Sequence, residues 1–465
     1  MTRRNLTIQA HKEEENSATP EGNIAPDSMR IFVTLVTTCV GLSLLSTALQ
    51  TALPSLIASL GVSLSAGQWV TSGYALALAV MTPFTAFLST RFSTRPLYLG
   101  ALGCFLVGTL ISALAPTFAF LMVGRVLQAS ANALIANITQ VSILTLFPDK
   151  SRGRAMGWFG LATSAAPIAA PALGGLVVDA WGWRAVFWLI GALCLASFIA
   201  ATFFMKNILP SAPKQFDPVS FCLSIAAFGG ITLGLGNIVS SGITNVFVWA
   251  PLVVGALCGV PFVARQLKSE SPFLKVQLFS VRNFRTATIT SMLLYAAMMG
   301  ASAVLPLFIQ GQLPGQLGYS ATVSGLVVLP GACATALISP VAGRIYDRFG
   351  VRVLAFVGGG VMALSCAVLC IPGLAHSVAV LTLTNMVRCA AVGCLTMPLM
   401  TWGNTSVSQQ DMPHASALLT SMRNIAGALG TAIFVGLFEA LGIELCFAAL
   451  AATNFLIVLL FIMRR

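Results

Sequence analysis

From Ile31 onward, the sequence is a series of long apolar runs separated by short loops that hold most of its charge. A helix rises 1.5 Å per residue, so about 20 apolar residues cross a hydrocarbon core of roughly 30 Å. Fourteen runs reach that length. In lipid, every backbone polar group of a spanning segment must be paired internally, which a helix achieves alone. The runs therefore predict an all-α polytopic membrane protein with fourteen spans.

Composition supports lipid as the main solvent of this chain. Of 465 residues, 57% are hydrophobic and 8% are charged, whereas charged residues make up about 25% of soluble domains. So few charges cannot cover a surface that faces water on all sides. Residues 1–30 are different, because they are polar with few large apolar side chains. We expect them to form a disordered cytoplasmic tail, without the pattern of a signal peptide.

Positive charge gives an independent test of this layout. With the N-terminus inside, the cytoplasmic segments hold 21 of the 25 Lys and Arg residues; the others are Arg125, Arg388 and Arg423 within spans and Arg184 at an outer edge. Cytoplasmic loops carry such an excess. The net charge of +12 therefore orients a membrane protein and contacts anionic head groups, rather than nucleic acid. We expect a multi-pass protein of the inner (cytoplasmic) membrane with both termini in the cytoplasm.

One short basic loop occurs twice, in "TPFTAFLSTRFSTR" and in "SPVAGRIYDRFGVR", which begins 257 residues later. Eight spans fit this separation at roughly 32 residues each, loop included. The chain is therefore expected to hold two similar six-helix halves in the same orientation. Parallel repeats of this kind occur in transporters whose substrate binds near the midplane between the halves. The predicted domains are the tail 1–30, an N-terminal bundle 31–205, a linker 206–283 with two extra helices, and a C-terminal bundle 284–465.

The loops and several span motifs resemble the major facilitator superfamily, and within it the fourteen-span drug:proton antiporters. The family loop reads Gly-x-Leu-Ala-Asp-Arg-x-Gly-Arg-Arg, and "GRVLQAS" and "APALGG" resemble its Arg-x-x-Gln-Gly and Gly-Pro-x-x-Gly-Gly motifs. The resemblance covers nearly all of residues 31–440. The matching residues are Arg91 and Arg95 in the first loop, Asp347, Arg348, Gly350 and Arg352 in the second, Arg125 and Gln128, and Pro171, Gly174 and Gly175.

The resemblance implies the major facilitator fold and secondary active efflux of drugs or other amphipathic toxic compounds, coupled to protons as an antiport. It also implies that Asp347 faces the start of a neighbouring helix, where the helix dipole and Arg348 favour a carboxylate. Such a contact can lock one end of the transporter closed. The first loop has Thr90 in place of the acid. An alternative for both loops is that their arginines are topology signals only.

Arg125, Gln128 and Asn132 fall at i, i+3 and i+7, on one face of a helix. Insertion scales put the cost of an Arg at membrane depth at roughly 2.5–3.5 kcal/mol, so Arg125 should face the interior of the N-terminal bundle and serve transport. The alternative is an Arg that extends to the membrane interface.

Pro167 and Pro171 precede the pair Gly174 and Gly175. A proline removes a backbone hydrogen bond and kinks a helix. We expect a kinked helix with a small face that packs against the other half and seals it, with ordinary helix packing as the alternative.

Proton coupling needs a titratable group, and the antiporters that this chain resembles carry an Asp in the first span. Leu45 stands at that position. Glu439 is the leading candidate for a proton carrier, and Asp179 is the second. Both lie at the outer ends of spans near motif residues. The alternative is that both are solvated loop acids.

A substrate cavity between the halves is expected by analogy, lined by polarizable and polar side chains that suit many apolar shapes. Any one of them could instead serve helix packing. The candidates are Gln50, Asn132, Tyr295, Met298, Met299, Asn385 and Met386.

The sequence contains no pattern for a cofactor or metal: the eleven Cys residues are scattered, the three His residues form no cluster, and no nucleotide-binding fingerprint occurs. The expected partners are a small-molecule substrate, the lipid bilayer and protons, without nucleic acid or nucleotide. Two alternatives remain open. One is an exporter or flippase of the same fold for one metabolite or lipid, without proton coupling. The other, a membrane-embedded enzyme or sensor, would need titratable groups gathered at one depth, so no enzyme is expected.

Overall fold

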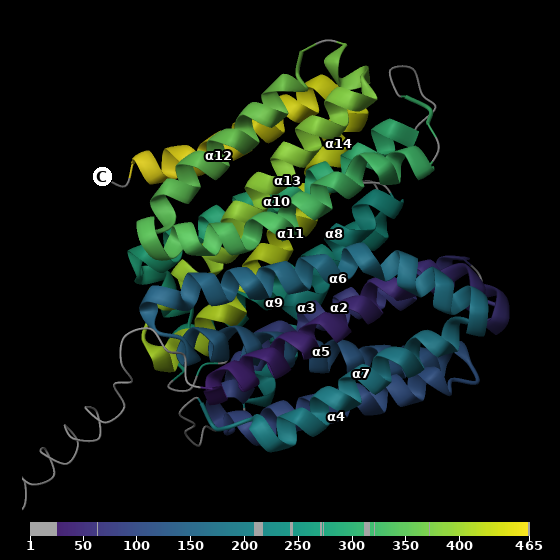
Figure 1. Cartoon of the computed structure of the whole chain (residues 1–465), viewed down its shortest axis with the longest axis vertical. Coiled ribbons are helices and arrows are strands. Elements are labelled where there is room, and N and C mark those ends of the chain that lie inside the picture. The colour runs from purple at the N-terminus through teal and green to yellow at the C-terminus, as the bar shows by residue number, and fades with distance from the viewer. Residues whose placement is uncertain are drawn as a thin grey trace, which may run out of the picture.

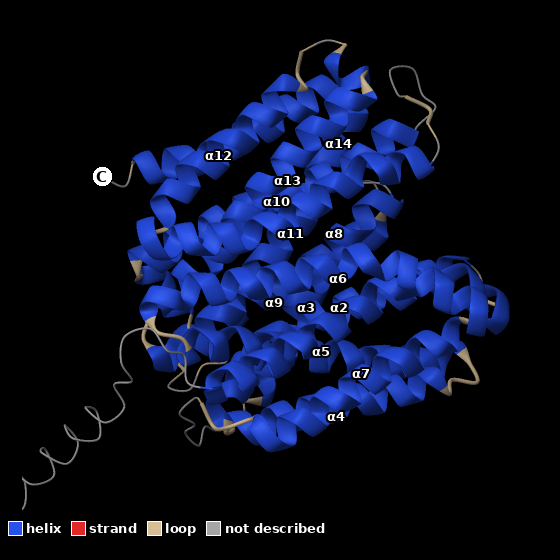
Figure 2. Cartoon of the chain, in the orientation of Figure 1, coloured by secondary structure: helices blue, strands red, loops and turns tan. Residues whose placement is uncertain are grey.

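The computed structural model describes residues 26–463, apart from residues 63, 209–216, 242–244, 270, 271, 273, 311–316, 320 and 372. Every regular element in these residues is a helix (Figure 2), which confirms the all-α prediction. Most of the predicted tail, residues 1–25, lies outside the described residues. Its last five residues are helical instead, because the first helix begins at Pro26 and carries Asp27 in its first turn, where the helix dipole favours a carboxylate.

Two bundles of helices lie side by side, one from each half of the chain (Figure 1). The first holds α2 (Pro26–Leu60), α3 (Leu64–Arg91), α4 (Thr94–Ala113), α5 (Phe118–Leu146), α6 (Arg152–Trp181) and α7 (Trp183–Phe204). The second holds α10 (Arg282–Gln310), α11 (Ala321–Phe349), α12 (Val351–Val368), α13 (Val378–Thr405) and α14 (Met412–Ile462). Between them in the chain come α8 (Pro218–Ser241) and α9 (Val246–Lys268).

The predicted count of fourteen spans is not confirmed. Twelve helices of the described residues are long and apolar enough to cross a membrane, or thirteen with α6 counted as one bent span. The 51-residue α14 is much longer than one crossing needs. Gly442 interrupts it with φ +80°, a left-handed conformation that glycine adopts without steric cost.

The halves meet mainly along two helix pairs, α6 with α11 and α3 with α14, and also where α13 contacts α6 and α14 contacts α5. The inserted pair joins this interface because α8 packs on α9, on α3 and on α14. Small residues allow the close approach: a Cβ added at Gly230 of α8 would lie 2.5 Å from the carbonyl oxygen of Pro251 in α9. Without a hydrophobic drive between helices in lipid, such close packing is a main source of their association.

The inserted pair is also held at its ends by polar contacts. Asp217 accepts hydrogen bonds from the backbone N–H groups of Val219 (3.1 Å) and Ser220 (3.2 Å) and from the Arg265 guanidinium of α9 (2.9 Å). Burial raises the pKa of Asp217, but the hydrogen bonds from Ser220 and Arg265 outweigh it and lower that pKa to about 2. A lowered folded-state pKa means that this stabilisation is complete above the usual Asp pKa of about 4 and is lost as the pH falls through about 2.

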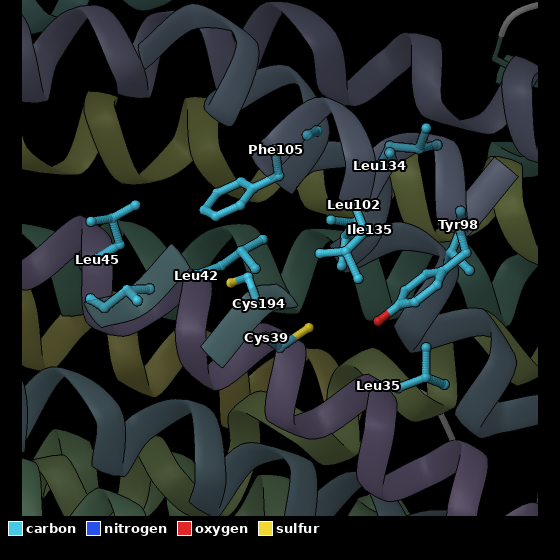
Figure 3. Packing of buried hydrophobic residues seen from close by; sticks show 14 of the residues in the cluster. Leu35, Cys39, Leu42, Leu45, Tyr98, Leu102, Phe105, Leu134, Ile135 and Cys194 are labelled. Carbon is cyan, nitrogen blue, oxygen red and sulfur yellow. The ribbon is translucent and has the colours of Figure 1, made fainter. Parts of the chain in front are cut away.

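The core of the first half packs α2 against α4, α5 and α7 (Figure 3). Its labelled side chains include Leu42, Leu45, Phe105, Ile135 and Cys194. Leu45 is 1% exposed and belongs to this apolar cluster. An ionised carboxylate at position 45 would lose its solvation in such surroundings, which agrees with the apolar residue found there.

Candidate functional site

A cavity of about 370 Å³ lies between the two halves. Helices α3, α5 and α6 line it from the first half, and α10, α11, α13 and α14 from the second. Its walls mix polar side chains with aromatic and thioether groups, the composition of a site for small organic molecules. The lining includes Asn137, Gln140, Phe159, Tyr295, Met298, Thr396, Met397, Thr420, Arg423 and Asn424.

Of the seven residues predicted for the cavity, Tyr295 and Met298 line it and five do not. Met299 follows Met298 by about 100° around α10 and faces Gly427 of α14 instead. Asn132 donates a hydrogen bond to the Tyr74 hydroxyl (2.7 Å) within the first half.

The remaining three residues are also directed elsewhere. Asn385 donates to the Val327 carbonyl of α11 (3.4 Å) and accepts from Arg388 (2.8 Å). Gln50 is exposed on α2, a helix that contributes nothing to the lining, and Met386 is partly buried on α13 outside it. The direction of each side chain depends on the rotation of its helix about its axis. The analogy that suggested these residues did not include that rotation.

Two polar residues of α5 that line the cavity form hydrogen bonds with α14 in the other half. Gln140 accepts a hydrogen bond from the Ser416 hydroxyl (2.6 Å), and the Asn137 amide donates to the Pro413 carbonyl (3.3 Å). Both bonds lie in the first turns of α14. They join the halves on one side of the cavity.

That side is the basic end, which we define by Arg91, Lys150 and Arg348 at or beside the ends of α3, α5 and α11; its cytoplasmic location stays a prediction. Here Asp347 of α11 accepts hydrogen bonds from the backbone N–H groups of Gly153 (2.7 Å) and Arg154 (2.8 Å). Both donors belong to the first turn of α6. The carboxylate thus caps a helix of the other half, where unpaired N–H groups and the positive end of the dipole meet.

Close helix packing surrounds the Asp347 contact. A Cβ added at Gly343 would lie 2.2 Å from the carbonyl oxygen of Gly153, and one added at Gly157 would lie 2.6 Å from that of Ser339. Neither position tolerates a side chain in this arrangement. Sequence reasoning missed Gly153 and Gly157, although "RGRAMGWFG" places glycines four apart as in close-packed membrane helices.

The other residues of the basic loops stay within their own half. Thr90 donates to the carbonyl oxygens of Ala86 (3.1 Å) and Phe87 (3.0 Å) in its own helix. The Arg91 guanidinium lies 5.8 Å from the Phe87 ring, and Arg95 donates to the Thr202 carbonyl (2.6 Å).

In the second loop, Arg348 lies over the ring of its neighbour Phe349, at 5.1 Å. Gly350 precedes α12 with φ +73°, and Arg352 is exposed. Asp347 thus faces the start of a neighbouring helix, as the resemblance implies, and it accepts hydrogen bonds from the two backbone donors of α6.

Arg125 lies inside the first half, as the sequence predicts, with 1% of its surface exposed. Its Nε donates to the Val70 carbonyl (3.2 Å), and a terminal nitrogen donates to Gln128 (2.8 Å), which in turn donates to Thr109 (3.0 Å). The guanidinium stacks 4.0 Å from the Tyr74 ring centre. This network joins α3, α4 and α5.

The antiporter-like segment of α6 bends but packs differently from the expectation. The axes of Asp149–Ile168 and Leu173–Trp181 differ by 43°, and Pro171 falls at the break. Gly174 lies against α2 of its own half, because an added Cβ would meet Ala48 at 2.9 Å, whereas Gly175 has open space beside it and Pro167 is exposed. The contact with the other half is made upstream instead, at Gly153 and Gly157.

Glu439 and Asp179 are exposed and lie outside the cavity lining. No Asp or Glu of the described chain lines that cavity. Their role in coupling stays a prediction that this geometry does not test.

Comparisons with known proteins agree with this architecture. The family model described as Major Facilitator Superfamily matches residues 33–431. The Listeria monocytogenes lincomycin resistance protein LmrB is 31% identical over 394 residues, which cover 85% of this chain and 83% of that protein. The Mycobacterium tuberculosis multidrug resistance protein Stp is 28% identical over 86% of this chain and 75% of its own length.

The crystal structure of the human organic anion transporter MFSD10 (TETRAN) superposes with a TM-score of 0.69 at 14% identity, covering 94% of this chain and 100% of that chain. At this identity the similarity concerns the fold. The family model matches most of the chain, and the two-bundle fold agrees with it. The chain therefore belongs to the major facilitator superfamily of membrane transporters.

Proposed function

We propose that this protein exports amphipathic toxic compounds, drugs among them, as a secondary transporter that works by alternating access. The observation that carries the proposal is the cavity between the halves, closed at the basic end by the cap of Asp347 on α6. Relatives named for resistance to lincomycin and to multiple drugs support export as its direction.

Alternating access requires the closed end to open again. Opening the basic end would break the two bonds of Asp347 and the contacts of Gln140 and Asn137 with α14. Each such bond contributes only about 0.5–3 kcal/mol net, so a few of them can hold one state without making it permanent. The same few bonds reform when the halves rock back.

Proton antiport is the coupling that we propose, with Glu439 and Asp179 as carriers outside the cavity. A second candidate is export of one metabolite or lipid without proton coupling. Two observations favour it: no carboxylate of the described chain lines the cavity, and Leu45 lies buried in an apolar core.

Export is tested with two dyes of one scaffold, the cation rhodamine 6G and the anion fluorescein, in cells without exporters of their own. Expression of this protein should accelerate the efflux of at least one dye severalfold over cells that express the Asp347→Asn variant at equal abundance. Equal efflux of both dyes in empty and expressing cells would contradict the proposed function.

Coupling is tested in proteoliposomes with an imposed pH gradient. We expect a gradient that is acidic on the outer face to accelerate export severalfold, because protons then flow inward through carboxyls that exchange them. The double variant Glu439→Gln with Asp179→Asn should lose this acceleration. If the double variant keeps it, these carriers are excluded; if the wild-type rate ignores the gradient, uncoupled export is the better description.

A further inference from the structure

We propose that the cavity selects compounds that carry an anionic group, a carboxylate or sulfonate on an apolar body, and that Arg423 is the side chain that binds this group. The inference rests on the proposed function and names its substrate class. It starts from one arginine of α14 that faces the cavity together with Thr420 and Asn424.

The described part of the chain leaves the charge of Arg423 without a counterion. Its Nε is buried and has no hydrogen-bond partner there. Its guanidinium lies over the Tyr295 ring, 4.3 Å from the centre, an attraction that orients the group but leaves its N–H donors available. The terminal nitrogens of a guanidinium form a fixed fork of N–H donors that is suited to the two oxygens of a carboxylate or sulfonate.

The acids of the described chain are all placed elsewhere. None of them lines the cavity, and Arg423 is the one charged residue in the lining that the structure describes. Asp347 caps α6, Asp217 pairs with Arg265, and Asp411 pairs with Lys275. The remaining described acids are Asp27, Asp149, Asp179, Glu439 and Glu444, each outside the lining.

Two further buried arginines add positive charge inside the halves. Arg125 in the first half and Arg388 in the second are both buried, and their hydrogen-bond partners are neutral oxygen and sulfur atoms. Low-dielectric walls concentrate the field of such charges in the space that remains open. An anion entering the cavity therefore gains attraction, whereas a cation meets repulsion without a carboxylate to offset it.

The rest of the lining suits the apolar body of such a compound. Phe159, Met298 and Met397 provide aromatic and polarizable surface. A cavity of about 370 Å³ falls within the usual range for small organic ligands. Thr396 and Asn424 add hydrogen-bonding groups beside these walls.

The experiment measures binding and export of fluorescein and rhodamine 6G by the full-length protein, because the dyes share one ring system and differ in charge. Binding is followed by fluorescence anisotropy in detergent, and export as above. The variants are Arg423→Gln, which removes the charge, and Arg423→Lys, which keeps it. The control is Arg285→Gln, which removes an exposed arginine near the start of α10, far along that helix from Tyr295.

We expect wild-type protein to bind fluorescein at least tenfold more tightly than rhodamine 6G. Arg423→Gln should weaken fluorescein binding at least tenfold and leave rhodamine 6G binding equal or improved. Arg423→Lys keeps the charge but loses the fork, so its fluorescein binding should fall between those of Arg423→Gln and wild type. Arg285→Gln should stay within about threefold of wild type. Rhodamine 6G binding that is equal or improved in Arg423→Gln would also show that the site of this variant remains folded.

Two results would overturn the inference. One is fluorescein binding that is unchanged in Arg423→Gln. The other is export of rhodamine 6G alone, with a rate independent of Arg423, which would leave the proposed efflux function standing while excluding an anionic substrate class. Export of neither dye would count against both the function and its anion selectivity.

Discussion

Replacing Asp347 by Asn is expected to reduce transport at least tenfold at equal abundance in the membrane. The carboxylate accepts two backbone hydrogen bonds from the first turn of α6. An Asn side chain offers one oxygen and turns an NH2 group toward N–H donors, and it also loses the attraction of the charge for the helix dipole. Together these changes should cost about 2 kcal/mol of the closed state, or about a thirtyfold shift in its population.

The Asp347 prediction has a direct structural readout. Gly153 and Arg154 donate the two bonds, so hydrogen–deuterium exchange in the first turn of α6 should become severalfold faster in Asp347→Asn. Arg344→Gln is the control, since it removes an exposed charge of α11 three residues before Asp347 and leaves the two bonds to α6 in place. If Asp347→Asn exchanges and transports like wild type, the cap does not hold the basic end closed.

Replacing Arg125 by Leu is expected to abolish transport, with a loss of a hundredfold or more. Leucine would leave the Val70 carbonyl and the Gln128 oxygen without their donor in a buried site, and each unpaired group costs about 1–3 kcal/mol. Part of the effect will be lower stability, because the network joins three helices. Arg125→Lys separates the two effects, since it keeps the charge but lacks the planar group that stacks on Tyr74 and the two separate nitrogens that donate to Val70 and Gln128.

The measurement for Arg125 is transport at matched abundance, beside thermal unfolding of the purified protein. We expect Arg125→Lys to unfold near the wild-type temperature and to transport at a tenth of its rate or less. Gln128→Leu serves as a comparison, since it breaks the bonds of Gln128 to Thr109 and to Arg125 but keeps the guanidinium that stacks on Tyr74. If Arg125→Lys and Arg125→Leu both transport at the wild-type rate, Arg125 contributes to packing and has no role in transport.

The sequence by itself determined the class of fold and the position of its main contact. Apolar runs of spanning length must form helices, because backbone polar groups in lipid have to be paired within the segment. The duplicated loop motif indicates two related halves. Asp347 was identifiable because the second loop keeps the acid of the family motif that it resembles, whereas the first loop has Thr90 there. Arg125 was identifiable because a charge within a span must turn away from lipid.

Only the tertiary structure decided which faces of these helices meet. A span is apolar on its lipid side and on its packed side, so the sequence lacks the polar face that orients a helix in a soluble protein. Met298 and Met299 are therefore equivalent in sequence, yet one lines the cavity and the other packs against Gly427. Arg423 faces Tyr295 inside the cavity because the rotation of α14 against α10 places it there, and that rotation depends on contacts between residues more than a hundred positions apart.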